Sequence, residues 1–223
     1  MHTQRRSSMD KSIKNLLLRI IILFIGLTIA HLGVTLFLLA NLGADPFNVF
    51  VQGIFRTLSN IVSFPLLTHG NTHITICFLI IIALIFIDRT YIKIGTILCM
   101  IFGGPIIDVF TAILTAPFTY VNSLPLKILI NGLGCIILAF GMTIVMKSDA
   151  GTGPNDLVAI VLSDKIKKNF GLVRIIVDFL FVVIGFVLGG TVGIGTIICA
   201  FIVGLVANIF LPFNEKWIRK IVK

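Results

Sequence analysis

Long uninterrupted apolar runs constrain this chain more than any other feature of its sequence. A helix needs about 20 apolar residues to cross the hydrocarbon core of a bilayer. Six segments reach or approach that length, at 16–40, 72–87, 94–116, 126–146, 171–190 and 192–212. Hydrophobic residues make up 57% of the chain and charged residues 12%, against about 45–50% and about 25% in soluble domains. The sequence therefore predicts an all-α integral membrane protein with six transmembrane helices.

The basic residues lie in clusters between these runs, and their distribution predicts the orientation of the chain. With six spans and a cytoplasmic N-terminus, every Lys and Arg except Arg56 and Lys127 falls on the cytoplasmic side, as the positive-inside rule requires. If the more polar segments 46–64 and 154–170 also crossed, the basic cluster at 165–168 would lie on the wrong side. We therefore expect a multi-pass protein of the bacterial plasma membrane with both termini in the cytoplasm. The net charge of +9 then faces membrane lipid, and we expect no nucleic-acid partner.

The two halves of the chain resemble each other at ordered positions. An offset of 108 aligns Gly26, Gly33, Thr35, Gly43 and Pro46 with Gly134, Gly141, Thr143, Gly151 and Pro154. An offset of 100 aligns Gly95-Thr96-Ile97, Cys99, Gly104 and Phe110 with Gly195-Thr196-Ile197, Cys199, Gly204 and Phe210. Each half holds three predicted spans, an odd number, so the second half enters the bilayer inverted relative to the first.

These offsets predict an architecture of two inverted three-helix repeats, at 16–118 and 119–212. Each repeat has an extra short helix after its first span, starting at Pro46 or Pro154, because proline suits the first position of a helix. A basic cytoplasmic arm at 1–15 precedes the repeats, and a basic cytoplasmic tail at 213–223 follows them.

The turns before the two short helices carry a family resemblance. The chain has Gly43-Ala44-Asp45-Pro46-Phe47-Asn48, Val51-Gln52-Gly53, Ile94-Gly95-Thr96, Gly151-Thr152-Gly153-Pro154-Asn155-Asp156 and Val192-Gly193-Ile194-Gly195-Thr196. Over residues 20–212 this pattern resembles the YczE/YitT/YyaS group of bacterial integral membrane proteins, most of all its YczE branch. Phe47, Asn48 and Val51 depart from the Trp, Asp and His of the group's first turn. The resemblance implies the fold and, because the group has no assigned activity, leaves the function open.

The two Gly-Pro turns are the first candidate site. Each leads into a helix whose free N–H groups and positive dipole end face the turn, and inverted-repeat transporters bind anionic groups at such helix starts. The polar residues predicted to contact a solute there are Asp45, Asn48, Gln52, Asn155 and Asp156. The alternative is structural, because Asp45, Asn48 and Asp156 are also residue types that cap or begin helices.

Ionisable residues inside the predicted spans form the second candidate site, because such residues are rare and mark function. Arg174 and Asp178 are four residues apart and share a helix face. They could equally form an interfacial pair in which Arg174 reaches the headgroups. Asp108 lies deep in its span and aligns with Asn208, and His31 lies midway along the first span, where packing is the commoner role.

The sequence carries no His-Glu-x-x-His, Gly-x-Ser-x-Gly, Walker or Cys-x-x-Cys motif, so we expect neither an enzyme nor a cofactor or metal site. Its four cysteines each lie alone in an apolar run and are interpreted as small buried hydrophobic residues. We expect a secondary transporter, a permease for a small polar solute. The alternative is a non-transporting accessory or scaffold protein for another membrane or biosynthetic system. A homo-oligomer is compatible with either.

Overall fold

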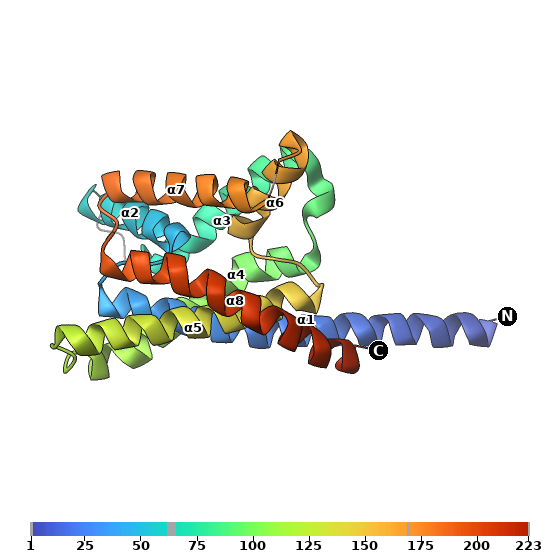
Figure 1. Ribbon diagram of the computed structural model, residues 1–223. Coiled ribbons are helices and arrows are strands. Elements are labelled where there is room, and N and C mark those ends of the chain that lie inside the picture. The colour runs from blue at the N-terminus through green and yellow to red at the C-terminus, as the bar shows by residue number, and fades with distance from the viewer. Residues whose placement is uncertain (1, 62–65, 169, 223) are drawn as a thin grey trace.

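The computed structural model describes residues 2–61, 66–168 and 170–222, and that part of the chain is entirely helical apart from its turns (Figure 1). The helices are α1 (His2–Ala40), α2 (Pro46–Ile61), α3 (His69–Asp88), α4 (Ile94–Phe118), α5 (Leu124–Ser148), α6 (Pro154–Ile166), α7 (Phe170–Val187) and α8 (Ile194–Ile221), with a 3₁₀ turn η1 (Arg89–Tyr91) after α3. Every segment predicted as a span or short helix forms a helix, and both short helices begin at the predicted proline. Residues 62–65 and 169, which belong to or border the predicted short helices, lie outside the described residues.

Five of the described helical segments are long and apolar enough to cross a membrane: Ile13–Ala40, His69–Tyr91, Ile94–Phe118, Leu124–Ser148 and Ile194–Ile221. The sixth predicted span corresponds to α7, which has 18 residues and contains Arg174 and Asp178, and its crossing stays a prediction. Helix α8 continues past Pro212 to Ile221, through most of the segment predicted as a tail. Helix α1 likewise begins at His2, within the predicted N-terminal arm.

The helices pack as two groups that differ in length. The long-helix group comprises α1, α4, α5 and α8, which have 25 to 39 residues. In this group α1 packs on α5 and α4, and α5 packs on α8. The short-helix group comprises α2, α3, α6 and α7, which have 13 to 20 residues. Here α2 packs on α7 and α3, and α6 packs on α7 and α3. In Figure 1, α2, α3, α6 and α7 lie above α1 and α5.

Glycines allow close backbone contact along the most extensive helix pairing among the described residues, which joins α1 to α5. A Cβ at Gly33 would lie 2.5 Å from the Gly134 carbonyl oxygen, and a Cβ at Gly141 would lie 2.6 Å from the Gly26 carbonyl oxygen. The two backbones therefore touch at both crossing points, as small residues permit in membrane helices.

The turns after α1 and α5 have the same unusual backbone. Asn41 and Asp149 are left-handed, with φ of 52° and 57°, and two residues later Gly43 and Gly151 have φ of 115° and 151°. A side chain would strain the backbone at such glycine positions. These residues turn the chain from α1 and α5 of the long-helix group into α2 and α6 of the short-helix group.

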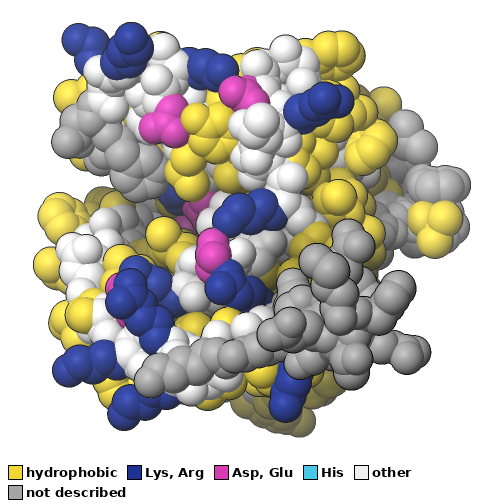
Figure 2. Space-filling view, turned by 90° about the vertical axis from the view of Figure 1, so that its right-hand side faces the viewer, with side chains coloured by type: hydrophobic (Ala, Val, Ile, Leu, Met, Phe, Trp, Pro, Cys, Tyr) yellow, Lys and Arg dark blue, Asp and Glu magenta, His cyan; other side chains and the backbone are white. Residues whose placement is uncertain are grey.

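Charged side chains gather at the end of the molecule that holds both termini (Figure 2). Asp149 accepts hydrogen bonds from Lys93, at 2.9 Å, and from Arg19. These two cations hold the pKa of Asp149 below its usual range. The same end carries the Lys165–Asp88 pair at 2.8 Å and the Lys147–Glu215 pair at 2.6 Å. This face is therefore rich in ion pairs with an excess of basic residues.

The cysteines depart from the sequence interpretation. Cys77 and Cys99 are free and buried, as expected. Cys135 of α5 and Cys199 of α8 form a disulfide, with their Cα atoms 5.5 Å apart. The interpretation of all four as isolated residues was wrong for this pair, because 64 positions separate the two along the chain and only the packing of α5 on α8 brings them together.

Candidate functional site

The first turn places Asp45 immediately before α2, at its N-cap. The Asp45 carboxylate accepts hydrogen bonds from the Asn48 backbone N–H at 3.4 Å and from Asn48 Nδ2 at 2.6 Å. One turn further along α2, Gln52 accepts a hydrogen bond from the Thr191 backbone N–H at 2.7 Å. Asp45 therefore accepts hydrogen bonds at the start of α2, and Gln52 links α2 to the connection between α7 and α8 through a hydrogen bond.

At the second turn, residues of the two candidate sites predicted from the sequence lie in one cluster. Gly153 caps α6 and Pro154 is its first residue. Arg174 of α7 donates from Nη1 to Asp156 Oδ1 at 2.6 Å and from Nε to Asp178 Oδ2 at 2.9 Å. Asn155 donates to Asp156 at 3.3 Å. Arg174 and Asp178 therefore form an ion pair on one face of α7, and the guanidinium also reaches the first turn of α6.

The two turns belong to one polar region inside the short-helix group. Asp45 lies close enough to Arg174 and Asp178 to interact with both electrostatically. The side chains of Arg174, Asp156 and Asp178 are 29%, 15% and 26% exposed, so they are held mainly among protein atoms. We name this set, Asp45, Asp156, Arg174 and Asp178, the central cluster. It contains one cation and three carboxylates between apolar helices.

Two histidines that the sequence interpretation missed adjoin this cluster on the side of α3. His69 Nε2 lies 3.4 Å from Asn48 Oδ1. The His73 ring lies 5.7 Å from the His31 ring and 5.4 Å from the Phe47 ring, centroid to centroid. The signal in the sequence was the spacing of His69 and His73, one helical turn apart at the start of an apolar run. Their meeting with His31 depends on how α3 packs beside α1.

Asp108, predicted as an intramembrane ionisable residue, has a structural task. Its Oδ1 accepts from the Gly70 backbone N–H at 3.0 Å, and its Oδ2 accepts from the Thr68 hydroxyl at 2.6 Å. Thr68 in turn caps α3 by accepting from the Asn71 backbone N–H. Asp108 of α4 therefore holds the first turn of α3 and stands apart from the central cluster.

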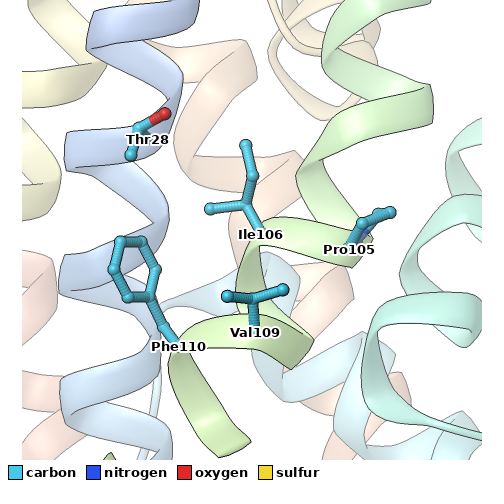
Figure 3. Close-up of a pocket in the computed structure, with 5 residues that line it drawn as sticks. All are labelled: Thr28, Pro105, Ile106, Val109 and Phe110. Carbon is cyan, nitrogen blue, oxygen red and sulfur yellow. The ribbon is translucent and has the colours of Figure 1, made fainter. Parts of the chain in front are cut away.

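Two pockets are lined by residues outside the central cluster. A pocket of about 270 Å³ opens beside the second turn and is lined by Thr90, Tyr91, Lys93, Met146, Asp149, Gly151, Thr152, Leu157 and Ile160. A second, of about 220 Å³, lies between α1 and α4 and is lined by Thr28, Pro105, Ile106, Val109 and Phe110 (Figure 3). The hydroxyl of Thr28 already donates to the Phe24 carbonyl. The first pocket is therefore lined in part by polar groups, whereas the second is an apolar recess.

Arg56 links three elements at the opposite end of the molecule. It donates to the Gly189 carbonyl at 2.9 Å, to Thr191 Oγ1 at 2.8 Å and to Asn41 Oδ1 at 3.3 Å. These bonds join α2 to the end of α1 and to the connection between α7 and α8. No group of three or more His, Cys, Asp or Glu suited to a metal ion occurs in the part of the chain that the structure describes.

Comparison with known proteins places this arrangement among membrane proteins. Residues 17–212 match a family of unknown function, DUF6198. The chain is 30% identical over 200 residues to the uncharacterized membrane protein YczE of Bacillus subtilis strain 168, covering 89% of this chain and 88% of YczE. It is 26% identical to the uncharacterized protein YyaS of the same organism, covering 86% and 92%. An uncharacterized protein of Haemophilus influenzae is also 26% identical, covering 85% and 82%. No solved structure matches the chain.

Proposed function

Because the chain belongs to the family DUF6198 and is a membrane protein, we propose that it is a secondary transporter, a permease for a small polar solute. The observation that carries the proposal is the central cluster. Charged groups inside a membrane protein are costly and are kept where a solute or ion passes. Here they lie where the starts of two short helices approach each other, an arrangement that transporters use for binding.

We propose further that the chain consists of two inverted repeats. Support comes from contacts whose partners exchange under the sequence offsets. Gly26 approaches Gly141 and Gly33 approaches Gly134, and each contact becomes the other when its residues are moved by 108 positions. The pattern of helix packing behaves alike, since α1 on α4 corresponds to α5 on α8 and α2 on α7 corresponds to α6 on α3.

Backbone hydrogen bonds at the turns give a second, independent support for the repeats. The Gly95 N–H donates to the Ala150 carbonyl at 2.9 Å, and the Gly195 N–H donates to the Leu42 carbonyl at 2.8 Å. Gly95 and Gly195 are related by the offset of 100, and Leu42 and Ala150 by the offset of 108. Each turn therefore rests on the first residues of the last helix in the other half.

The charge of the central cluster favours a solute with a positive group. Asp45 already caps α2, so the start of that helix does not depend on an external anion. Three carboxylates face a single guanidinium, and an amine or guanidine of the solute would balance the excess. The excess of carboxylates therefore favours a cationic solute over the anionic one expected from the two helix starts alone.

Flux into proteoliposomes tests the transporter. Purified protein is reconstituted and tested for uptake of labelled amino acids, polyamines, sugars and dicarboxylates. We expect uptake of at least one probe, loss of that uptake in Arg174→Gln, and normal uptake in the matched control Arg219→Gln, whose guanidinium is 78% exposed. Absence of uptake of every probe by correctly folded protein, or equal uptake in both variants, would contradict the proposal and favour an accessory role.

We propose that the basic face of Figure 2 is cytoplasmic, because basic residues remain on that side during insertion. Single cysteines placed at 165–168, in a background with the native cysteines replaced, are expected to resist an impermeant thiol reagent in intact cells. A cysteine at Ser59 of α2 is expected to react. Labelling of 165–168 from outside would reverse the orientation.

A further inference from the structure

Three buried or half-buried imidazoles form a line where α3 meets α1 and α4. His69 and His73 lie one turn apart on α3, and His31 faces His73 from α1. His31 and His73 are only 9% and 7% exposed. Nothing in the transport site described above uses these rings, although uncharged imidazole is the side chain best suited to take up and release a proton near neutral pH.

The hydrogen bonding of the pair leaves proton-accepting nitrogens free. His31 Nδ1 lies 2.8 Å from the Leu27 carbonyl, and because a carbonyl only accepts, this nitrogen carries the hydrogen. The lone pair of neutral His31 is therefore on Nε2. His73 Nδ1 is buried and has no hydrogen-bond partner among the described residues. Buried polar atoms without a hydrogen-bond partner are rare in native structures.

Both rings turn the same nitrogen toward one glycine of α4. A Cβ on Gly103 would lie 2.9 Å from His31 Nε2 and 3.1 Å from His73 Nε2. The absence of a side chain at Gly103 is what allows α4 to approach the two rings. The pair is thus enclosed by α1 and α4 of the long-helix group and by α3 of the short-helix group.

This position is also the main helix contact between the two groups. Gly104, the neighbour of Gly103, touches α3 so closely that a Cβ there would lie 2.2 Å from the Gly70 carbonyl oxygen. A positive charge on one imidazole raises the cost of burying the pair, and charge on both adds direct repulsion across the contact. Protonation of either imidazole therefore weakens the contact between α3 and α4.

We propose that the His31–His73 pair is the proton-binding site of this protein, an inference that rests on the proposed transport function and adds the proton as its coupling ion. A proton binds the free lone pair of an imidazole nitrogen while the α3–α4 contact is open. It leaves before that contact re-forms, and no covalent bond other than N–H forms or breaks. His73 interacts electrostatically with His31 and His69, and His69 interacts with Arg56 of α2. Asn48, which lies 3.4 Å from His69, is hydrogen-bonded to Asp45 just before α2. Asp108 of α4 accepts from Thr68 and Gly70 at the start of α3.

The site occurs once in the chain. The position related to His31 by the offset of 108 is Ala139, and the position related to His73 by the offset of 100 is Val173. Both are apolar and buried. The second half therefore offers no matching proton acceptor, which fits one coupling site per chain.

Spin labels test the site without a known solute. Cysteines replace Thr75 on α3 and Ile101 on α4, both exposed, in a chain with Cys77 and Cys99 changed to Ala. In lipid nanodiscs we expect the distance between the labels at positions 75 and 101 to lengthen as the pH falls from about 8 to about 5. His73→Gln and His31→Gln should each abolish this change, whereas the control His2→Gln should keep it. A distance that ignores pH in the parent, or responds equally in the variants, would overturn the proton site.

Proteoliposomes with a trapped pH dye separate this inference from the transport function. For any probe that the wild-type protein takes up, the His73→Gln variant should still exchange that probe across the membrane. Its uptake driven by a proton gradient should fall by about tenfold or more. Undiminished proton-driven uptake in His73→Gln would overturn the proton site and leave transport standing. No probe uptake by wild type, together with a pH-dependent label distance, would overturn transport and leave the proton site.

Discussion

Helices α3 and α4 in the first half pack tightly, whereas α7 and α8, the corresponding pair in the second half, do not. Gly104 approaches the backbone of Gly70, but Gly204, which the offset of 100 relates to Gly104, has no described atom within 4 Å of a Cβ built on it. Asp108 holds the start of α3, while its counterpart Asn208 is exposed. From the proposed inverted repeat we propose that this difference marks one of two alternating states. The short-helix group rests on α4 in this state and moves toward α8 in the other.

The two halves also divide the chemistry between them. The first half supplies the imidazoles His31, His69 and His73. The second supplies Arg174 and Asp178, whose counterparts in the first half are Ile74 and Phe78. Positions related by the sequence offsets therefore carry different groups. A substitution in one half is expected to have a different effect from its counterpart in the other.

The largest expected difference lies between Gly104→Leu and Gly204→Leu. At Gly104 the new side chain must displace Gly70 and Ile74, so we expect a loss of about 1–3 kcal/mol or more in the free energy of unfolding. At Gly204 the side chain meets open space and the stability should change little. Thermal unfolding in detergent measures both variants. Equal destabilisation would mean that α7 and α8 pack as closely as α3 and α4.

Asp178→Asn is expected to lower transport by about tenfold, or ~1.4 kcal/mol, at an unchanged amount of protein in the membrane. The change keeps the shape of the side chain but removes a charge from the central cluster, leaving Asp156 as the one carboxylate that accepts a hydrogen bond from Arg174 among the described residues. Uptake by proteoliposomes, or complementation of a deletion strain, measures the effect. Wild-type activity would remove Asp178 from the candidate site.

Asp108→Ala should destabilise the protein by about 1 kcal/mol, as the loss of a helix cap does. The N–H of Gly70 and the hydroxyl of Thr68 would lose their acceptor. The partner variant Asn208→Ala removes an exposed amide and should have almost no effect. Chemical denaturation of both variants in the same detergent checks the contrast. A larger loss for Asn208→Ala would reveal a contact made by α8 in the membrane.

The smallest effect is expected for Asp149, whose counterpart Asn41 carries no charge. Because the pKa of Asp149 is lowered, its ion pairs stabilise the folded protein at pH values above the ordinary pKa of a carboxylic acid. This stabilisation is lost as the pH falls and the carboxylate is protonated. Because Asp149 is exposed, we expect Asp149→Asn to cost about 0–1 kcal/mol near neutral pH and nothing in acid. Melting temperatures of the wild-type protein and the variant, measured from neutral to acidic pH, test this prediction. A destabilisation by Asp149→Asn that grows as the pH falls would contradict it.

The sequence predicted the helices well because apolar runs and helix-starting prolines are local signals. The pairing of Arg174 with Asp178 was also local, as the two lie one turn apart. The remaining contacts required packing between distant segments. His73 meets His31 only because Gly103 allows α4 to approach both rings, and Cys135 meets Cys199 only where α5 crosses α8. The sequence marks Asp108 as an unusual intramembrane residue. Its hydrogen bonds to the start of α3 could not be predicted, because they depend on the packing of α3 on α4.

Distances between spin labels on both helix pairs test the alternation most directly. One pair occupies Thr75 and Ile101, on α3 and α4, and the other occupies Ile175 and Phe201, the exposed positions that the offset of 100 relates to them. In lipid nanodiscs the account predicts that each pair has a near and a far distance. Conditions that shift the first pair from near to far should shift the second from far to near. A single distance for each pair under all conditions, or two distances that change in the same direction, would contradict the proposal that the two halves exchange their contacts.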